Sequence, residues 1–94
     1  MPFKEYTFHD IVAAIEKTNK NYRIDFIQKA YDFAAAAHEG QFRKSGEKYI
    51  NHPTAVAIIL IELGMDSESV VAALLHDVVE DTEVTIDEVR EKFG

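Results

Sequence analysis

The chain carries its most telling pattern at the end of an apolar segment, in the stretch Leu74-Leu75-His76-Asp77-Val78-Val79-Glu80-Asp81-Thr82. Residues 70–75 are apolar almost without interruption, which predicts a helix that is buried on most of its surface. On a helix, His76 shares a face with Glu80, and Asp77 shares a face with Asp81, because side chains four apart lie together. His76 and Asp77 point about 100° apart, so one ion between those directions could bind both. The pattern suits metal-assisted hydrolysis, with two ligands and two carboxylates that handle water and protons.

The overall composition limits the class of protein. Ninety-four residues, 47% of them hydrophobic and 29% charged, are typical of one small globular domain. A net charge of -7 argues against non-specific binding to DNA or RNA, which needs a basic surface. The absence of cysteine rules out disulfides and thiolate metal sites and fits the cytoplasm. The longest apolar run, residues 55–61, is too short to cross a membrane, and no secretory signal is expected.

Hydrophobic periodicity predicts an all-α protein of about five helices. Apolar residues recur at three- and four-residue steps, and strand-like alternation does not persist. A Thr7 capping box, a proline at the first position of the third helix and glycines after helix ends mark the boundaries. The expected segments run from Thr7 to near residues 19–21, from Ile24 to Gly40, from Pro53 to Gly64, from Asp66 or Ser67 through Asp77, and from Thr85 to Phe93.

The loop between the second and third expected helices holds the one compact basic patch of this acidic chain. Arg43, Lys44 and Lys48 could be an ordinary solvated loop. They could also bind an anion, because arginine pairs with phosphate bidentately and lysine supplies a mobile charge. Phe42 and Tyr49 flank these cations, and we favour them as anchors of the loop over platforms for a nucleotide base.

Each group at the end of residues 74–82 also has an ordinary structural explanation. An isolated His-Asp pair is more often a helix end whose aspartate faces solvent. Two features change that balance, because a buried Asp77 needs a partner or a metal and His52 offers a second imidazole from another helix. The place of His52 near a helix N-terminus favours neutral imidazole, the form that binds metals.

The acidic pair Glu80 and Asp81 would, by itself, be a solvated turn. Beside a metal, like charges and burial would raise the pKa of one carboxyl enough for acid–base work, although spacing does not tell which one. His38 fits a buried helix histidine with a hydrogen-bonded partner better than a metal ligand. A role in which it orients one of the metal ligands stays an alternative.

Two long segments resemble one known family. The first resembles the loop in the hydrolase domain of the RelA/SpoT homologues, the bifunctional (p)ppGpp synthetase/hydrolases of the bacterial stringent response. The second resembles the HD motif of the same domain, and the resemblance runs from about Ile24 to Gly94. The two segments are Ala37-His38-Glu39-Gly40-Gln41-Phe42-Arg43-Lys44-Ser45-Gly46-Glu47-Lys48-Tyr49-Ile50-Asn51-His52-Pro53 and Ala73-Leu74-Leu75-His76-Asp77-Val78-Val79-Glu80-Asp81-Thr82.

The resemblance implies a helical HD-superfamily fold with a bound Mn²⁺, although imidazole and carboxylate ligands also admit Fe, Co or Zn. The implied reaction is hydrolysis of the 3′-pyrophosphate of (p)ppGpp, which leaves GDP or GTP. Synthetase-only relatives have degraded HD and acidic pairs, and both pairs are intact here. The implied roles are metal ligands for His52, His76 and Asp77, a water-activating pair for Glu80 and Asp81, and one wall of the guanine-nucleotide pocket for Arg43, Lys44 and Ser45.

One departure from the family pattern concerns completeness. The family's metal site has a fourth protein ligand, an aspartate well downstream of the acidic pair, and this chain stops at Gly94 before that segment. We therefore expect residues 1–94 to be the N-terminal part of an HD-type (p)ppGpp hydrolase domain that is weakly active or inactive alone. Helices that lack partners should expose apolar stripes and favour self-association.

Three alternatives stay open on sequence grounds. One is an HD phosphohydrolase with a different nucleotide substrate, against which the loop of Arg43, Lys44 and Ser45 argues. The second is a non-catalytic helical module that senses nucleotide or docks a partner, against which the intact Glu80 and Asp81 argue. The third is a folded fragment with no activity of its own.

Overall fold

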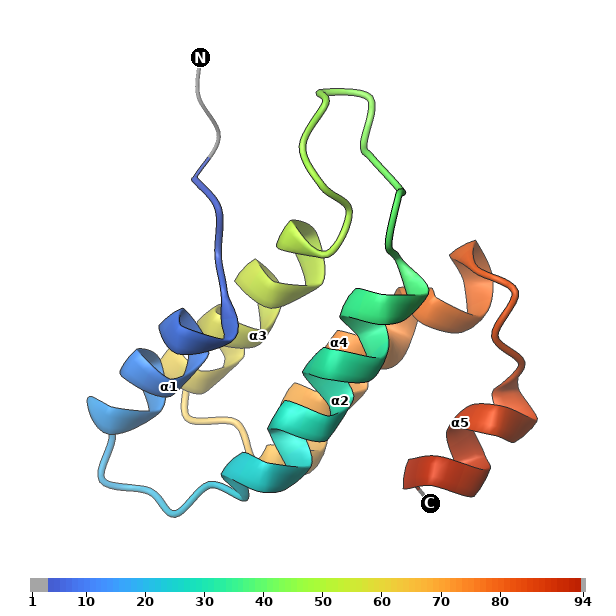
Figure 1. The fold of residues 1–94 in the computed structure, drawn as a ribbon. Coiled ribbons are helices and arrows are strands. Elements are labelled where there is room, and N and C mark those ends of the chain that lie inside the picture. The colour runs from blue at the N-terminus through green and yellow to red at the C-terminus, as the bar shows by residue number, and fades with distance from the viewer. Residues whose placement is uncertain (1–3, 94) are drawn as a thin grey trace.

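The computed structural model describes residues 4–93 and is all-α, as the sequence predicts (Figure 1). An isolated bridge between Phe42 and Lys48 is the only strand-like pairing in that part of the chain. No helix between residues 4 and 93 combines the length and apolar character needed to cross a bilayer. The helices are α1 (Phe8–Glu16), α2 (Ile24–Ala37), α3 (Asn51–Glu62), α4 (Ser67–Asp81) and α5 (Ile86–Phe93).

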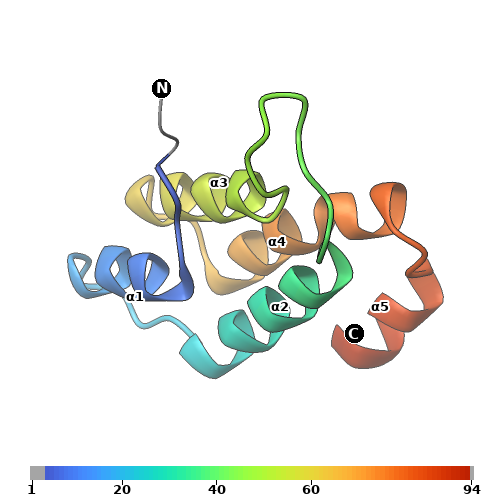
Figure 2. The same ribbon diagram turned by 45° about the horizontal axis from the view of Figure 1, so that its top comes forward.

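The helix that carries the His-Asp pair is also the centre of the fold. α4 packs against both α2 and α3, and α1 packs mainly on α3 (Figures 1 and 2). After the end of α4 the chain turns back, and α5 lies beside α2, where Phe93 packs on Phe26 and Phe33. Fully buried side chains from α1 to α4 meet in one core, among them Ile11, Ile27, Ile61, Leu74 and Val78. Burying a side chain of this size stabilises a fold by about 1.5–3 kcal/mol. The candidate residues His76, Asp77, Glu80 and Asp81 therefore stand on the helix at the centre of the packing.

Several expected helix boundaries were wrong, and local hydrogen bonds explain two of them. α1 ends at Glu16 and not near residues 19–21, because backbone N–H groups of Lys17 and Thr18 bond three residues back and tighten the last turn. α3 begins at Asn51, so Pro53 is its third residue and His52 lies inside the first turn. Bonds from the N–H groups of Asn51 and His52 to carbonyls three residues earlier extend the helix backward past the proline.

The helix starts agree with the capping signals at Thr7, Asp66 and Thr85, but two helix ends differ from the expectation. α2 ends at Ala37, three residues before Gly40, and α4 continues to Asp81, four residues past Asp77. Asp10 accepts from the Thr7 backbone N–H at 2.8 Å, and Asp66 accepts from the Ser69 N–H at 2.8 Å. The Thr85 hydroxyl accepts from the N–H of Glu88 at 3.2 Å at the start of α5. Gly40 turns the chain after α2 with a φ of 82°, a left-handed conformation that glycine adopts without strain. The expected stop at Gly94 lies outside the described residues.

One buried hydroxyl links the start of α2 to the start of α4. Ser67 is 6% exposed, and its Oγ accepts from the Arg23 backbone N–H at 3.0 Å. Ser67→Ala should lower the free energy of unfolding by about 1–2 kcal/mol, because it leaves that N–H without its partner. Urea denaturation would measure the change, and Ser45→Ala in the exposed loop is the matched control. Equal stability of the two variants would contradict the prediction.

Candidate metal centre and catalytic carboxylates

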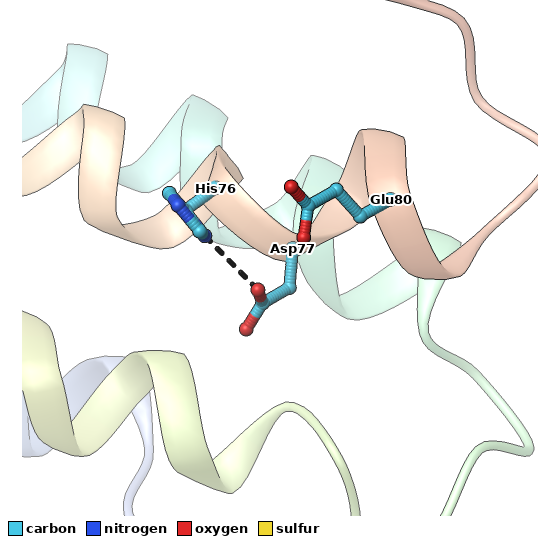
Figure 3. Close-up of side chains that lie close together, drawn as sticks. All are labelled: His76, Asp77 and Glu80. Carbon is cyan, nitrogen blue, oxygen red and sulfur yellow. Dashed lines mark hydrogen bonds and ion pairs between the residues drawn. The ribbon is translucent and has the colours of Figure 1, made fainter.

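Three side chains of α4 meet on one side of the helix. His76, Asp77 and Glu80 each offer a ligand atom, and these atoms all lie within 4.8 Å of one another. The His76 Nδ1 and the Asp77 Oδ1 are 3.0 Å apart, and the Glu80 carboxylate reaches back over the turn that carries them (Figure 3). The spacing of His76 and Glu80 explains the arrangement, because residues four apart in a helix are surface neighbours.

His52 approaches this group from the first turn of α3. It lines a hollow of about 290 Å³ together with His76 and Asp77, and the remaining wall is apolar, from Pro53, Val56, Ala72 and Ala73. The side chain of His76 is 71% exposed and that of Asp77 is 20% exposed, so Asp77 faces inward and His76 faces solvent. The three expected ligands therefore line one hollow between α3 and α4. Glu80 offers a further ligand atom close to those of His76 and Asp77, whereas the sequence suggested only a role in acid–base catalysis for it.

Asp81 lies apart from Glu80, although the two are adjacent in sequence. The Tyr49 hydroxyl donates to the Asp81 Oδ2 at 2.9 Å, and it lies near enough to the Asp77 carboxylate for each group to shift the other's pKa. Asp77 and Asp81 thus share a face of α4, as their spacing predicts, and Tyr49 lies near both. Burial and these carboxylates raise the pKa of the Tyr49 hydroxyl well above its ordinary value, so it stays protonated and acts as a donor.

A buried histidine supports this tyrosine from behind. The His38 ring stacks on the Tyr49 ring with centroids 4.6 Å apart. His38 is 2% exposed and its Nδ1 bonds the Gln41 Oε1 at 2.9 Å, as expected for a buried histidine with a partner. The Gln41 Nε2 in turn donates to the backbone carbonyl of Asp81 at 2.6 Å. Among the described residues, the buried His38 Nε2 has no hydrogen-bond partner.

The basic loop is exposed and lies apart from this hollow. Arg43, Lys44 and Ser45 are all exposed, and none of them lines the hollow of His52, His76 and Asp77. Tyr49 anchors the loop to α4, as the sequence favoured. Phe42 does not, because 61% of its surface is exposed. The loop projects beyond the ends of α2 and α3 (Figures 1 and 2).

The residues around the hollow fit a divalent metal ion. Imidazole nitrogens and carboxylate oxygens are the donors that Mn, Fe, Co and Zn accept. His76 and Asp77 lie within hydrogen-bonding distance of each other, and a Glu80 oxygen lies within 4.8 Å of both. With the His52 imidazole on the same hollow, these groups supply enough ligands for a metal site that keeps a position open.

Comparison with known proteins agrees with this geometry. The sequence model of the HD domain family matches residues 30–94, which include every candidate ligand and both carboxylates. This chain belongs to the HD domain family. The name fits the His76-Asp77 pair at the centre of the site.

The relatives of this HD domain support the narrower resemblance seen in the motifs. A guanosine-3′,5′-bis(diphosphate) 3′-pyrophosphohydrolase of Aquifex aeolicus is 57% identical over 68 residues, 72% of this chain and 10% of that protein. A Haemophilus influenzae protein of the same name is 61% identical over 61 residues, 65% of this chain and 9% of its own length. The bifunctional (p)ppGpp synthase/hydrolase SpoT of Escherichia coli K12 is 46% identical over 89 residues, 95% of this chain and 13% of that protein. The part of this chain that matches thus spans about a tenth of the length of these relatives.

Without a metal, the charges around the site favour an ion pair between protonated His76 and the Asp77 carboxylate. The hydrogen bond to Asp77, together with the negative charges of Asp77 and Glu80, raises the pKa of His76. Desolvation raises the pKa of Asp77, but hydrogen bonds from His76 and Tyr49 and the charges of His76 and His52 outweigh it and lower the net pKa. A proton on His76 therefore competes with a metal, because only neutral imidazole is a ligand.

This competition predicts a pH dependence of metal binding. Because the pKa of His76 is raised, its proton must be displaced already at a pH where an ordinary histidine is neutral. The Mn²⁺ affinity should be constant at high pH and fall by up to about tenfold per unit as the pH drops below that pKa. Mn²⁺ titrations between pH 8 and pH 6 would measure the fall. A constant affinity over that range would contradict His76 as a ligand.

Proposed function

We propose that this chain carries the metal-binding and water-activating part of a metal-dependent hydrolase that removes the 3′-pyrophosphate of (p)ppGpp. The observation that carries the proposal is the close group of His76, Asp77 and Glu80 beside His52, in a chain whose relatives are named as 3′-pyrophosphohydrolases. Residues 1–94 would form the N-terminal part of the hydrolase domain.

The metal would be Mn²⁺, held by His52, His76 and Asp77. When bound, such an ion supplies Lewis-acid polarisation of a phosphoryl oxygen and a more acidic water. The inward orientation of Asp77 and the hydrogen bond between the His76 Nδ1 and the Asp77 Oδ1 support the pair as ligands. Glu80 is near enough to take a place in the same ligand set.

The carboxylates of Glu80 and Asp81 would orient water and accept its proton. Glu80 is suited to this by its place beside the candidate ligands, where a water that attacks a phosphorus atom would lie. Asp81 already accepts a hydrogen bond from Tyr49, so its free oxygen would have a fixed direction. Arg43, Lys44 and Ser45 would bind the nucleotide, with the arginine on a phosphate or the guanine face and the serine as a hydrogen-bond donor.

The products of the reaction would be GDP or GTP and pyrophosphate, formed in the cytoplasm. Water supplies the oxygen and the two protons that balance the cleavage of one phosphoester bond to the 3′-oxygen. The remote phosphates and the guanine base would contribute binding energy that fixes the reacting group.

Single-turnover hydrolysis is the appropriate test, because we expect weak activity from this chain alone. The chain would be held in excess over labelled ppGpp with Mn²⁺, and the released products would be separated by chromatography. We expect slow release of pyrophosphate from the 3′ position that chelation stops and that His76→Ala abolishes. Tight ppGpp binding that survives chelation, without any turnover, would favour a non-catalytic nucleotide-sensing module instead.

We also propose that the chain associates with itself and binds neither DNA nor membranes. Ile59, Leu63 and Met65 are 52%, 71% and 43% exposed on one end of α3 and the turn after it, which leaves apolar surface in contact with water. Light scattering at high protein concentration should give a mass above that of one chain. A monomer under those conditions would contradict self-association.

A further inference from the structure

The basic loop is braced by a partly buried network built on Glu47 and Asn51, two residues to which the proposed reaction gives no role. Glu47 lies at its centre, with a side chain that is 18% exposed. Its Oε1 accepts from the Arg43 Nη1 at 3.2 Å, and its Oε2 accepts from the Asn51 Nδ2 at 2.8 Å. One carboxylate therefore accepts from two donors, one on each side of the loop.

Asn51 extends this network to the N-terminal segment. Its side-chain Nδ2 also donates to the backbone carbonyl of Lys4 at 2.8 Å, and its Oδ1 accepts from the Tyr6 N–H at 2.6 Å. Asn51 is 7% exposed, and both hydrogens and the oxygen of its amide are used. This pattern fixes the orientation of the amide, because each atom meets a partner of the opposite kind.

The loop backbone holds Arg43 only partly. The Arg43 N–H donates to the Glu47 carbonyl at 2.9 Å, and the Gly46 N–H donates to the Arg43 carbonyl at 2.8 Å. These bonds fix the main chain of the turn, with Gly46 at a φ of 94°. The Arg43 side chain is 44% exposed, and within the described residues its guanidinium has one ion-pair partner, Glu47. An arginine without that partner would sample many rotamers and lose them on binding a ligand.

We propose that Glu47 and Asn51 are positioning residues for the nucleotide-binding loop. Asn51 holds the Glu47 carboxylate, Glu47 holds the Arg43 guanidinium in advance of binding, and the backbone of residues 4–6 holds Asn51. The N-terminal segment is thereby part of the framework of the nucleotide site. This inference rests on the proposed role of Arg43 in binding (p)ppGpp.

Glu47→Gln separates the two functions of the carboxylate. A glutamine side chain has one acceptor oxygen, so its NH₂ group must face a donor of either Arg43 or Asn51. We expect ppGpp to bind about threefold to tenfold more weakly to this variant, which corresponds to the cost of ordering one long side chain. Glu39→Gln, which removes the same charge from an exposed position near the loop, should bind ppGpp like the unmodified chain.

A double-mutant cycle distinguishes positioning from general destabilisation. Calorimetric titration of ppGpp into the full chain would compare the unmodified protein, Glu47→Gln, Arg43→Ala and the double variant. If Glu47 acts through Arg43, Glu47→Gln should have no further effect once Arg43 is alanine. In parallel, nitrogen-15 relaxation of the Arg43 side chain without nucleotide should show a more mobile guanidinium in Glu47→Gln, and amide hydrogen exchange should accelerate at Tyr6 in Asn51→Ala.

The outcomes separate this proposal from the proposed function. An equal loss of affinity in both backgrounds, or an Arg43 side chain that is no more mobile in Glu47→Gln, would overturn the positioning role while ppGpp binding stands. Failure of the unmodified chain to bind ppGpp, or full affinity of Arg43→Ala, would overturn the nucleotide pocket itself, and the positioning role with it.

Discussion

Asp77→Ala is expected to weaken Mn²⁺ binding by about 100-fold or more. Loss of a partner that only orients a ligand typically costs 10–100-fold in metal affinity, and loss of a ligand should cost at least as much. Asp77 is also the group that joins the site together. It is hydrogen-bonded to the His76 Nδ1 at 3.0 Å and lines the hollow with His52. It also lies near the Tyr49 hydroxyl that donates to Asp81. Its removal therefore deletes one ligand and leaves the imidazole of His76 without the hydrogen bond that orients it.

Electron paramagnetic resonance of free Mn²⁺ would measure this loss, because bound ion loses the sharp signal of the free ion. Asp87→Ala is the matched control, since it removes the same charge from an exposed position in the first turn of α5. Equal affinities of these two variants would show that Asp77 is not a ligand.

The same titration can decide between two candidates for the third ligand. The sequence resemblance implies His52, whereas the closest third donor in the structure is Glu80. His52→Ala should weaken Mn²⁺ binding more than Glu80→Gln if Glu80 serves the water. The opposite order would assign Glu80 to the metal.

Leu74→Ala should lower the free energy of unfolding by about 2–5 kcal/mol. Leu74 is fully buried in α4, where the core side chains of α2 and α3 meet, and its truncation leaves a cavity that the packed helices cannot close. A domain of this size has a total stability of roughly 5–14 kcal/mol, so the loss is a large part of the whole.

Thermal and urea unfolding would measure the loss for Leu74→Ala. Ile86→Ala is the matched control, because a side chain of the same size at that position is 57% exposed and its loss should change stability by no more than about 0.5 kcal/mol. A cost at Leu74 no larger than that at Ile86 would contradict α4 as the centre of the core.

The fold was largely predictable because its signals are local. The apolar periodicity of each helix, the cap at Asp66 and the turn at Gly40 depend on neighbours within a few residues. Two of the misplaced ends, Glu16 and Asn51, depend on short i→i-3 bonds, which leave no mark on hydrophobic spacing.

The site was predictable only where one helix carries it. The four-residue spacing correctly places His76 near Glu80, and Asp77 on a face with Asp81. It does not reveal Tyr49 as the hydrogen-bond donor to Asp81, because that contact spans 32 residues of sequence. Nor does it reveal that Asn51 bonds the backbone of Lys4 and Tyr6, which requires the N-terminal segment to lie beside the loop. Such contacts depend on tertiary packing, and the tyrosine and asparagine concerned look ordinary in the sequence.

Calorimetric titration of Mn²⁺ into the unmodified chain tests the metal centre most directly. We predict saturable binding of one ion per chain, with protons released at a pH where His76 carries one. The absence of saturable binding at any pH between 6 and 8 would contradict a metal site built from His52, His76 and Asp77.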